Sequence, residues 1–303
     1  MKKFALIGAA GYIAPRHLKA IKETGNKLVC ALDPYDGIGI IYNFFPQADF
    51  FTEPERFDRH LDKLRRNIDL KVDYVSICSP NYLHDAHMRI ALRNGANAIC
   101  EKPLVLNPWN LDALQEIEIE TGKKIYTILQ LRLHPTIKQL KKNIDEGPKE
   151  KVYNVDLAYI TCRGKWYFIS WKGDIYKSGG ISTNIGIHFF DMLGWIFGDF
   201  KGLEINVHQR DKAGGKLYFE KANVNWFLSV DEKDLPIEAV TAKKRTSRKI
   251  VIDGQEIEFS EGFTDLHTSS YQDILSGGGY GIEDARKSIQ IASMLRNQKS
   301  INK

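Results

Sequence analysis

The sequence predicts an α/β protein in two parts, a doubly wound parallel sheet followed by an α/β domain with a mainly antiparallel, open sheet. Short apolar runs alternate with helical patterns through the first 130 residues, as parallel strands joined by helical crossovers require. From Lys151 the pattern changes to a loose alternation of polar and apolar residues, which is typical of half-buried strands. A chain of 303 residues also exceeds one ordinary domain, so two domains are the natural expectation.

The first part is predicted to hold buried strands separated by helices. Helices are indicated where apolar residues recur with a period of about 3.6 residues, and right-handed crossovers then place them on both faces of one sheet. The strand candidates are Phe4–Ile7, Leu28–Leu32, Tyr74–Ile77, Ala96–Cys100 and Ile125–Leu129. The helix candidates include Pro15–Thr24, Glu55–Arg66, Leu83–Asn94 and Asn110–Thr121.

The second part is predicted to be an open sheet. Its strand candidates are Val152–Ile160, Leu203–Val207, Lys216–Phe219, Ala222–Val230, Ile237–Val240, Lys249–Ile252 and Gln255–Phe259. Gly202, Gly214-Gly215 and Asp253-Gly254 separate these runs, and the last pair resembles a tight hairpin turn. We therefore expect domains at 1–130 and 131–281, with a closing helix at about 282–297 that packs back on the first domain.

The composition points to a globular protein without nucleic-acid partners. Hydrophobic residues make up 43% of the chain and charged residues 27%, enough apolar material for a sizeable core. The net charge is +5, but the longest basic cluster, Lys243-Lys244-Arg245 with Arg248 and Lys249, is short and interrupted. A solvated strand edge explains this cluster better than a nucleic-acid patch, although a mild basic excess would suit an anionic substrate.

Cysteine spacing and apolar run lengths give a prediction of compartment. Cys30, Cys78, Cys100 and Cys162 form no C-x-x-C pair, so reduced core thiols are expected rather than disulfides. The apolar run that follows Met1 is too short for a signal peptide, and no stretch approaches the ~18 uninterrupted apolar residues of a membrane span. We therefore expect a cytoplasmic protein with no membrane partner.

The first strand-to-helix turn reads Gly8-Ala9-Ala10-Gly11-Tyr12-Ile13 and lies where a dinucleotide-binding G-x-G-x-x-G loop belongs. Gly8 can take the tight turn, and the helix that follows offers unpaired N–H groups to phosphates. The match is imperfect, because Ala10 and Ile13 replace the second and third glycines. The loop predicts contacts with a dinucleotide from Gly8, Ala10, Gly11, Tyr12 and Ile13, while an ordinary α/β turn stays open as the alternative.

Asp33 strengthens the dinucleotide prediction. It ends the second strand candidate, 22 residues after Gly11, where an acidic side chain hydrogen-bonds the adenosine ribose hydroxyls. A carboxylate there would repel a 2′-phosphate, and no arginine follows in Pro34-Tyr35-Asp36. We therefore expect NAD rather than NADP as the cofactor, with Asp33 as a turn cap the alternative.

Two further strands end in polar side chains. Ser79, Asn81 and His84 follow the strand at 74–77, and Glu101 and Lys102 follow the strand at 96–100. Ligands of open parallel sheets bind at the carboxyl ends of the strands, so these side chains should face one crevice.

A glycine-rich entry to a helix stands out in the second half. The run Ser178-Gly179-Gly180 precedes a helix pattern from Asn184 to about Phe197. Asn184, His188 and Asp191 are spaced i, i+4, i+7, so an α-helix would carry them on one face.

The chain resembles the Gfo/Idh/MocA oxidoreductase family. The resemblance rests on the loop at 8–13, on Ser79-Pro80-Asn81-Tyr82-Leu83-His84 and above all on Glu101-Lys102-Pro103, while Gln130 lies where a further family segment leaves the sheet. It covers essentially the whole chain. It implies a Rossmann domain with Gln130 near the cofactor, followed by a substrate-binding domain whose sheet builds a homo-oligomer, a tetramer or a dimer.

The resemblance implies catalytic roles for Lys102 and His188. The ammonium of Lys102 can hydrogen-bond a reacting hydroxyl and favour the developing alkoxide. Family members usually carry an aspartate four residues before the histidine, where this chain has Asn184. An amide is no general base, so His188 and Lys102 must share the proton chemistry, and which of them is the base stays open. One histidine with Asn184 and Asp191 is a poor zinc set, so no metal is expected.

Asn184 and the segment 163–180 look like the branch of the family that oxidises the 3-hydroxyl of UDP-N-acetylglucosaminuronic acid, a step toward bacterial surface polysaccharides such as the lipopolysaccharide O-antigen. Arg163, Lys172 and Lys177 would meet a carboxylate and a diphosphate, beside Lys102, Asn184 and His188. The alternatives are a dehydrogenase of another sugar or polyol, such as an inositol, and a non-catalytic NAD-binding sensor.

Overall fold

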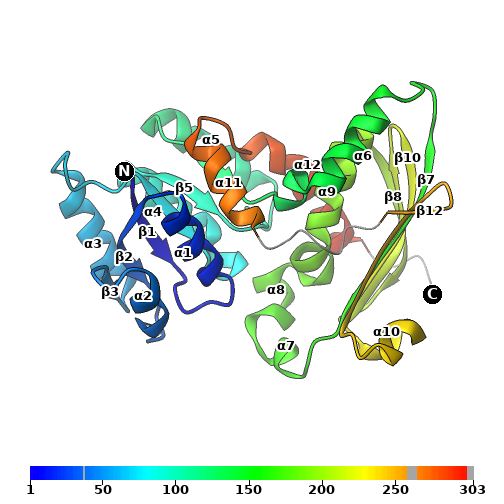
Figure 1. Ribbon diagram of the computed structural model, residues 1–303, viewed down its shortest axis with the longest axis horizontal. Helices are drawn as coiled ribbons and strands as arrows, with labels where there is room; N and C mark the ends of the chain where they lie inside the picture. Colours follow the sequence, from blue (N-terminus) through cyan, green and yellow to red (C-terminus); the bar gives the residue numbers. More distant parts are fainter. Residues whose placement is uncertain (37, 258–264, 299–303) are drawn as a thin grey trace. The chain divides into compact units, whose positions relative to one another are not determined.

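The computed structural model describes residues 1–36, 38–257 and 265–298 and divides into two compact units (Figure 1). The first unit comprises the described residues of Met1–Gln130 and Thr264–Arg286, and the second those of Leu131–Phe263 and Lys287–Lys303. Each unit contains one six-stranded sheet. The predicted fold class is confirmed, whereas the division into a cofactor domain and a substrate domain stays a prediction.

The sheet of the first unit is parallel throughout, and its strand order reverses between β1 and β4, as in a doubly wound fold. In order across the sheet, the strands are β3 (Asp49–Phe51), β2 (Lys27–Leu32), β1 (Lys3–Ile7), β4 (Tyr74–Ile77), β5 (Asn97–Cys100) and β6 (Ile125–Thr127). The central strand β4 is buried along its whole length, which explains why it reads as a continuous apolar run.

Helices that each bury one face follow five strands of this first sheet, and α11 joins them from a distant part of the chain. They are α1 (Ala14–Glu23), α2 (Ile38–Phe44), α3 (Pro54–Arg65), α4 (His84–Arg93), α5 (Trp109–Thr121) and α11 (Leu266–Leu275), with the short turn η1 (Asn81–Leu83) before α4. The distant helix α11 is part of the same core, because Tyr271 and Ile274 pack with Phe4 and Leu18.

The second sheet is mostly antiparallel, and only β7 and β10 pair in parallel. Its order is β12 (Gln255–Glu256), β11 (Thr246–Ile252), β7 (Tyr153–Thr161), β10 (Ala222–Ser229), β9 (Lys212–Phe219) and β8 (Phe200–His208). Two helices of this unit, α6 (Pro135–Glu146) and α9 (Ile187–Phe197), lie along one face of the sheet (Figure 1). Phe190 of α9 meets Trp226 of β10 edge to face, with ring centroids 5.3 Å apart.

Short helical segments complete the second unit. They are η2 (Gln130–Leu133), which begins in the first unit, and α7 (Trp166–Ile169), η3 (Trp171–Gly173), α8 (Ile175–Ser178), η4 (Ser182–Gly186), η5 (Glu232–Asp234) and α10 (Ile237–Thr241). The last helix, α12 (Ile282–Asn297), runs from the first unit into the second. None of the helices in the described ranges combines the length and apolar character needed to cross a membrane.

The structure corrects several elements expected from the sequence. The run Ile237–Val240 is helix α10 rather than a strand, because Pro236 begins a helix despite the β-branched residues that follow. The helix expected from Asn184 begins as a π-helical turn, η4, and becomes α-helical only at Ile187. Within the strand expected at Gln255–Phe259, β12 covers the first two residues, and 258–259 lie outside the described residues.

Candidate active site

The loop after β1 has the geometry that the glycine pattern predicts. Gly8 has φ +87°, and a Cβ there would lie 2.6 Å from backbone atoms of Cys78 and Ser79. Its N–H donates to Leu32 O at 2.8 Å. Only glycine combines this conformation with this close approach. The first turn of α1 differs from the expectation of unpaired N–H groups, because Ala14 N–H donates to Gly11 O at 3.1 Å, Arg16 N–H donates to Ile13 O at 3.0 Å, and Pro15 has no N–H.

Asp33 shapes this loop directly. Its carboxylate is 6% exposed, with Oδ2 accepting from Ala10 N–H and Oδ1 accepting from Tyr35 N–H, both at 2.9 Å. Each oxygen keeps a lone pair that could accept a ribose hydroxyl. Tyr12, in contrast, is 88% exposed. The loop and Asp33 therefore fit a dinucleotide with an unphosphorylated adenosine ribose.

The strand ends of β4 and β5 are tied together by His84. Its Nδ1 lies 2.7 Å from Pro103 O and its Nε2 lies 2.8 Å from Ser79 O. Both ring nitrogens thus face backbone carbonyls, so His84 positions two loops, and its role toward the cofactor stays a prediction. His87, which the sequence analysis missed, holds Ser79 Oγ through Nδ1 at 2.8 Å. Asn81 is buried beside them.

Glu101 points into the first unit, where it accepts two hydrogen bonds at one oxygen. His17 Nε2 of α1 and His267 Nε2 of α11 each lie 2.9 Å from Glu101 Oε1. These three groups are close enough to hold a metal ion, but hydrogen bonds already account for the atoms involved. The expected absence of a metal and the cofactor-binding role of Glu101 both stay predictions.

Lys102 follows Glu101 at the end of β5 and is half-buried, with a cis peptide bond to Pro103. Its backbone N–H donates to Glu101 Oε2 at 3.3 Å. At the end of β6, Gln130 Oε1 is buried and has no hydrogen-bond partner in the described part of the chain. An unsatisfied acceptor of this kind is costly unless a ligand donates to it, which fits a cofactor amide at this strand end.

Asn184 and His188 lie on the accessible side of their helix. Between Ile181 and Leu193 they are the two residues that are not buried. Asn184 Nδ2 donates to the buried Tyr167 Oη at 3.2 Å, and burial raises the pKa of Tyr167, so the phenol stays protonated. Tyr167 was not among the expected site residues, although it lies within the segment 163–180 that resembles one branch of the family.

Asp191 does not share that accessible side. It is 4% exposed and forms a bidentate ion pair with Arg132, with Nη2–Oδ1 at 2.7 Å and Nε–Oδ2 at 3.0 Å. The expected common face of 184, 188 and 191 is therefore wrong for Asp191, which instead anchors α9. The signal that could have found this pair was Arg132 directly after Gln130.

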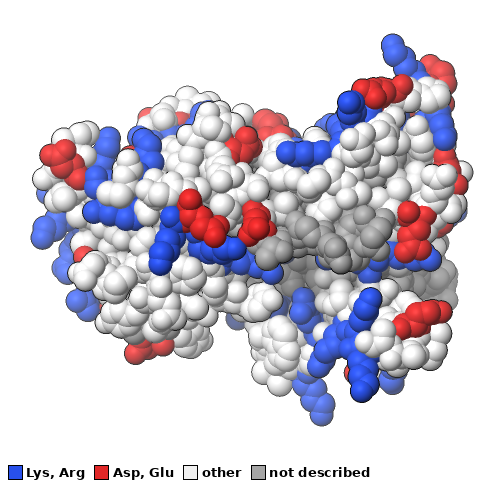
Figure 2. Space-filling model, viewed as in Figure 1, with Lys and Arg blue, Asp and Glu red and all other residues white. Residues whose placement is uncertain are grey.

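A cationic and aromatic cluster lies before α9. Lys172 Nζ lies 4.5 Å from the ring centroid of Trp171 and 5.6 Å from that of Trp166. Burial and the nearby Arg163 charge lower the pKa of Lys172. Among the residues that the structure describes, neither Lys172 nor Arg163 forms an ion pair with a carboxylate. Figure 2 shows Lys and Arg side chains gathered on this part of the unit. The third expected contact, Lys177, is exposed, and its Nζ lies 4.0 Å from Asp174 Oδ2.

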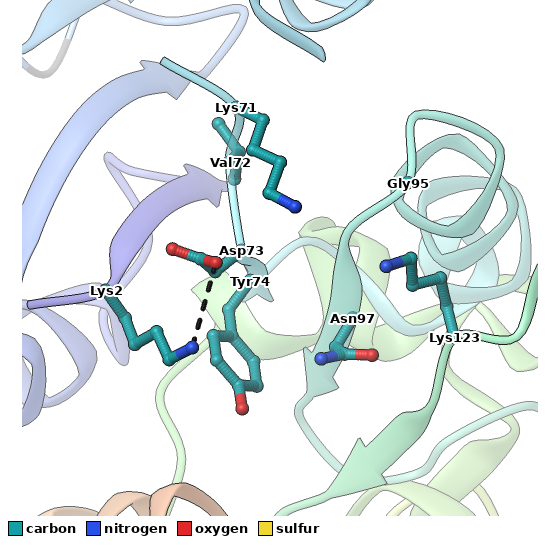
Figure 3. Close-up of a pocket in the computed structure, with 8 residues that line it drawn as sticks. All are labelled: Lys2, Lys71, Val72, Asp73, Tyr74, Gly95, Asn97 and Lys123. Carbon is teal, nitrogen blue, oxygen red and sulfur yellow. Dashed lines mark ion pairs between the residues drawn. The ribbon is translucent and has the colours of Figure 1, made fainter. Parts of the chain in front are cut away.

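A separate polar pocket lies at the opposite edge of the first sheet, at the amino ends of its strands (Figure 3). It is lined by Lys2, Lys71, Val72, Asp73, Tyr74, Gly95, Asn97 and Lys123. The residues expected to bind the cofactor lie at the carboxyl ends of the same strands, where ligands of doubly wound sheets bind. This pocket is therefore not the candidate active site.

The chain belongs to the Gfo/Idh/MocA oxidoreductase family. A family model described as an oxidoreductase family with an NAD-binding Rossmann fold matches residues 2–128, and the model of the family's C-terminal alpha/beta domain matches 141–235. These matches agree with the two-part fold and with the oxidoreductase family predicted from the sequence.

Solved structures narrow the comparison further. The WlbA (WbpB) dehydrogenase of Thermus thermophilus, in complex with NAD and UDP-GlcNAcA, is 50% identical, covers 99% of this chain and 96% of its own, and superposes with a TM-score of 0.95. The same enzyme in complex with NAD and alpha-ketoglutarate has a TM-score of 0.96. The WlbA dehydrogenase of Bordetella pertussis, at 18% identity and a TM-score of 0.79, shares the fold.

Curated relatives match over shorter segments. D-glucoside 3-dehydrogenase of Escherichia coli K12 is 26% identical over 145 residues, which is 48% of this chain and 41% of that enzyme. Inositol 2-dehydrogenase of Rhizobium meliloti is 27% identical over 65% of this chain and 55% of its own length. The matched segments thus span about half, or less, of these relatives.

Proposed function

We propose that this protein is an NAD-dependent dehydrogenase that oxidises the 3-hydroxyl of UDP-N-acetylglucosaminuronic acid to a ketone. The observation that carries the proposal is the 50% identity over 99% of the chain to a dehydrogenase in complex with NAD and UDP-GlcNAcA. The unpaired acceptor of Gln130 and the Gly8 loop support the cofactor. The cations that lack carboxylate partners support an anionic substrate.

The proton chemistry is assigned to Lys102 and His188. When bound, the cofactor supplies the hydride acceptor for the carbinol carbon. His188, on the accessible side of α9, takes the hydroxyl proton, because imidazole titrates near working pH. Lys102 donates a hydrogen bond to the same oxygen and stabilises its developing negative charge. Asn184 is held by Tyr167, so its amide can orient the sugar but cannot act as the base.

The substrate's charged end is assigned to the cluster of Arg163, Lys172 and Trp166. Two like charges that interact without a counter-ion are disfavoured, and a diphosphate or carboxylate between them would neutralise both. Trp166 is 51% exposed, so its ring can pack on a base or a sugar. An uncharged polyol would leave these cations unneutralised, which argues against the inositol alternative.

Product analysis by mass spectrometry tests the proposal. Purified protein is incubated with UDP-N-acetylglucosaminuronic acid and NAD, with and without 2-oxoglutarate as an acceptor that could return bound NADH to NAD. A product lighter by two hydrogen atoms is expected, and trapping of the ketone should locate it at C3. UDP-N-acetylglucosamine is the matched control, because it lacks only the carboxylate. Oxidation of myo-inositol alone would contradict the substrate and leave the dehydrogenase class standing.

We also propose that copies of this chain associate as a dimer or tetramer through the open face of the second sheet, and that the enzyme acts in the cytoplasm in O-antigen synthesis. On β7 and β10 the side chains of Asn154, Asp156, Asn223 and Asn225 are exposed, while Val155 and Leu157 are buried on the other face. Light scattering on the purified protein measures the number of subunits.

A further inference from the structure

Glu101 is the end point of a buried hydrogen-bond chain. His17 Nδ1 lies 2.7 Å from Tyr271 Oη, which in turn lies 2.6 Å from Ser76 Oγ. His17, Ser76 and Tyr271 are each 0% exposed, and Glu101 is 7% exposed. The chain therefore joins α1, α11 and β4 at the carboxylate that follows β5.

The direction of each hydrogen bond in this buried network follows from the carboxylate of Glu101, at which the network ends. A carboxylate can only accept, so His17 Nε2 and His267 Nε2 both carry the proton that they donate to Glu101 Oε1. With Nε2 protonated, neutral His17 accepts at Nδ1 from the Tyr271 hydroxyl, which then accepts from Ser76. All of the donors thus point toward Glu101.

The ionisation states agree with this direction. Burial opposes the charge on Glu101, but the hydrogen bonds from His17 and His267 outweigh it and hold the pKa of the carboxyl well below its usual range. Burial lowers the pKa of His17, so this ring is neutral at neutral pH. Burial also raises the pKa of the Tyr271 phenol, which therefore remains a donor.

The other carboxylate oxygen holds the neighbouring residue. Glu101 Oε2 accepts from Lys102 N–H, and Glu101 N–H donates to Ile77 O at 3.0 Å. The backbone from which the Lys102 side chain departs is thus fixed by a carboxylate that is itself held from two helices. One of them, α1, begins at the glycine loop.

We propose that Glu101 is a positioning residue that fixes the Lys102 ammonium for the reaction, rather than a ligand of the cofactor. This inference rests on the proposed role of Lys102. Glu101 accepts three hydrogen bonds inside the first unit, and these use both of its carboxylate oxygens. Because all three partners are donors, the carboxylate must be ionised. Replacing the charge should therefore affect turnover more than cofactor affinity.

Glu101→Gln isolates this role. The amide oxygen can still accept from both histidines, but the NH₂ group then faces the Lys102 N–H, donor against donor. We expect kcat to fall by about tenfold or more, with KM for the sugar and Kd for NAD changed by less than about threefold. Ser270→Ala is the matched control, because it removes a buried hydrogen bond from the same helix α11, to Leu266 O, without touching Glu101.

Other outcomes would overturn the inference. A large rise in Kd for NAD with unchanged kcat at saturation would make Glu101 a cofactor ligand. Ser270→Ala could lower kcat as much as Glu101→Gln does, with the same loss of thermal stability. The hydrogen bonds of Glu101 would then have only a structural role.

A second readout does not depend on turnover. The rate of reductive methylation of Lys102 in the NAD-bound protein, measured by peptide mass spectrometry, should differ between the wild type and Glu101→Gln. An unchanged rate would sink the inference. If the wild type oxidises no sugar, the proposed function fails, and this labelling still decides the role of Glu101.

Discussion

At the scale of single residues, the catalytic roles proposed for Lys102 and His188 give a prediction about turnover. Lys102→Ala and His188→Ala should each lower kcat by about 10²-fold or more, because a proton acceptor or an alkoxide donor is lost. Both variants should bind NAD as the wild type does, which isothermal calorimetry can check. Near-normal turnover in either variant would remove that residue from the mechanism.

Lys172 gives a prediction about affinity rather than rate. Lys172→Ala should raise KM for the UDP-sugar about tenfold and leave kcat nearly unchanged, because in the proposed complex the cation binds the charged end of the substrate, which does not react. The conservative variant Lys172→Arg keeps the charge and should recover most of the affinity. Steady-state kinetics separates the two parameters, and an equal loss of kcat would place Lys172 at the reacting end instead.

The ion pair of Arg132 and Asp191 predicts a loss of stability. Arg132→Met would remove the two hydrogen bonds that Arg132 donates to the buried Asp191 carboxylate, at a cost of about 3–5 kcal/mol in the free energy of unfolding. The double variant with Asp191→Leu should recover part of that loss. Urea denaturation measures both, and a single variant as stable as the wild type would mean that water or another group compensates the carboxylate.

At the scale of helices and strands, the glycine loop gives the sharpest prediction. Gly8→Ala would place a methyl group 2.6 Å from the backbone of Cys78 and Ser79 at a positive φ. We expect NAD binding to be lost and the melting temperature to fall, since backbone atoms cannot move aside as a flexible side chain can. Gly25→Ala is a suitable control, because it has φ +71° but nothing within 4 Å of the added atom.

Regular elements were predictable where local pattern and burial agree. The strands β1 and β4 and the helix α5 appear within one residue of their expected limits, because each has a strong apolar run or period. The edge strand β3 is three residues long and carries no such pattern. The π-helical turn at 182–186 likewise lies in a run that the sequence predicted as an ordinary α-helix from Asn184.

Within the candidate site, residue types were predictable but side-chain directions were not. Glu101 and Lys102 were expected at one strand end, where both lie. The partners of Glu101, however, are His17 and His267, which are 84 and 166 positions away along the chain. No local pattern links them, so only the folded packing of α1 and α11 shows that this carboxylate turns inward.

At the scale of the whole molecule, buried histidines predict sensitivity to acid. Burial lowers the pKa of His17 from 6.5, and that of His87 to about 4. The native protein keeps these rings neutral, while the unfolded chain takes up protons below pH 6.5. The free energy of unfolding should therefore fall with pH below that value, by at most about 1.4 kcal/mol per pH unit for each ring.

The contribution of His87 can be separated from the rest. His87→Gln removes one titrating group, so stability should decline less steeply between pH 6.5 and about 4 than in the wild type. Chemical denaturation at several pH values gives the two slopes. Identical slopes would mean that His87 has the same pKa in the native and unfolded states.

The contact between Asp33 and Ala10 bears on how the preference for one dinucleotide could be redesigned. The carboxylate that excludes a 2′-phosphate is also the acceptor that holds the Ala10 N–H, so deleting it to admit NADP would loosen the phosphate loop at the same time. A replacement that keeps an oxygen in place, such as Asp33→Ser, separates the two effects. The preference for one dinucleotide and the conformation of the phosphate loop thus depend on the same carboxylate. A variant designed to bind NADP must therefore also replace the hydrogen bond to Ala10 N–H.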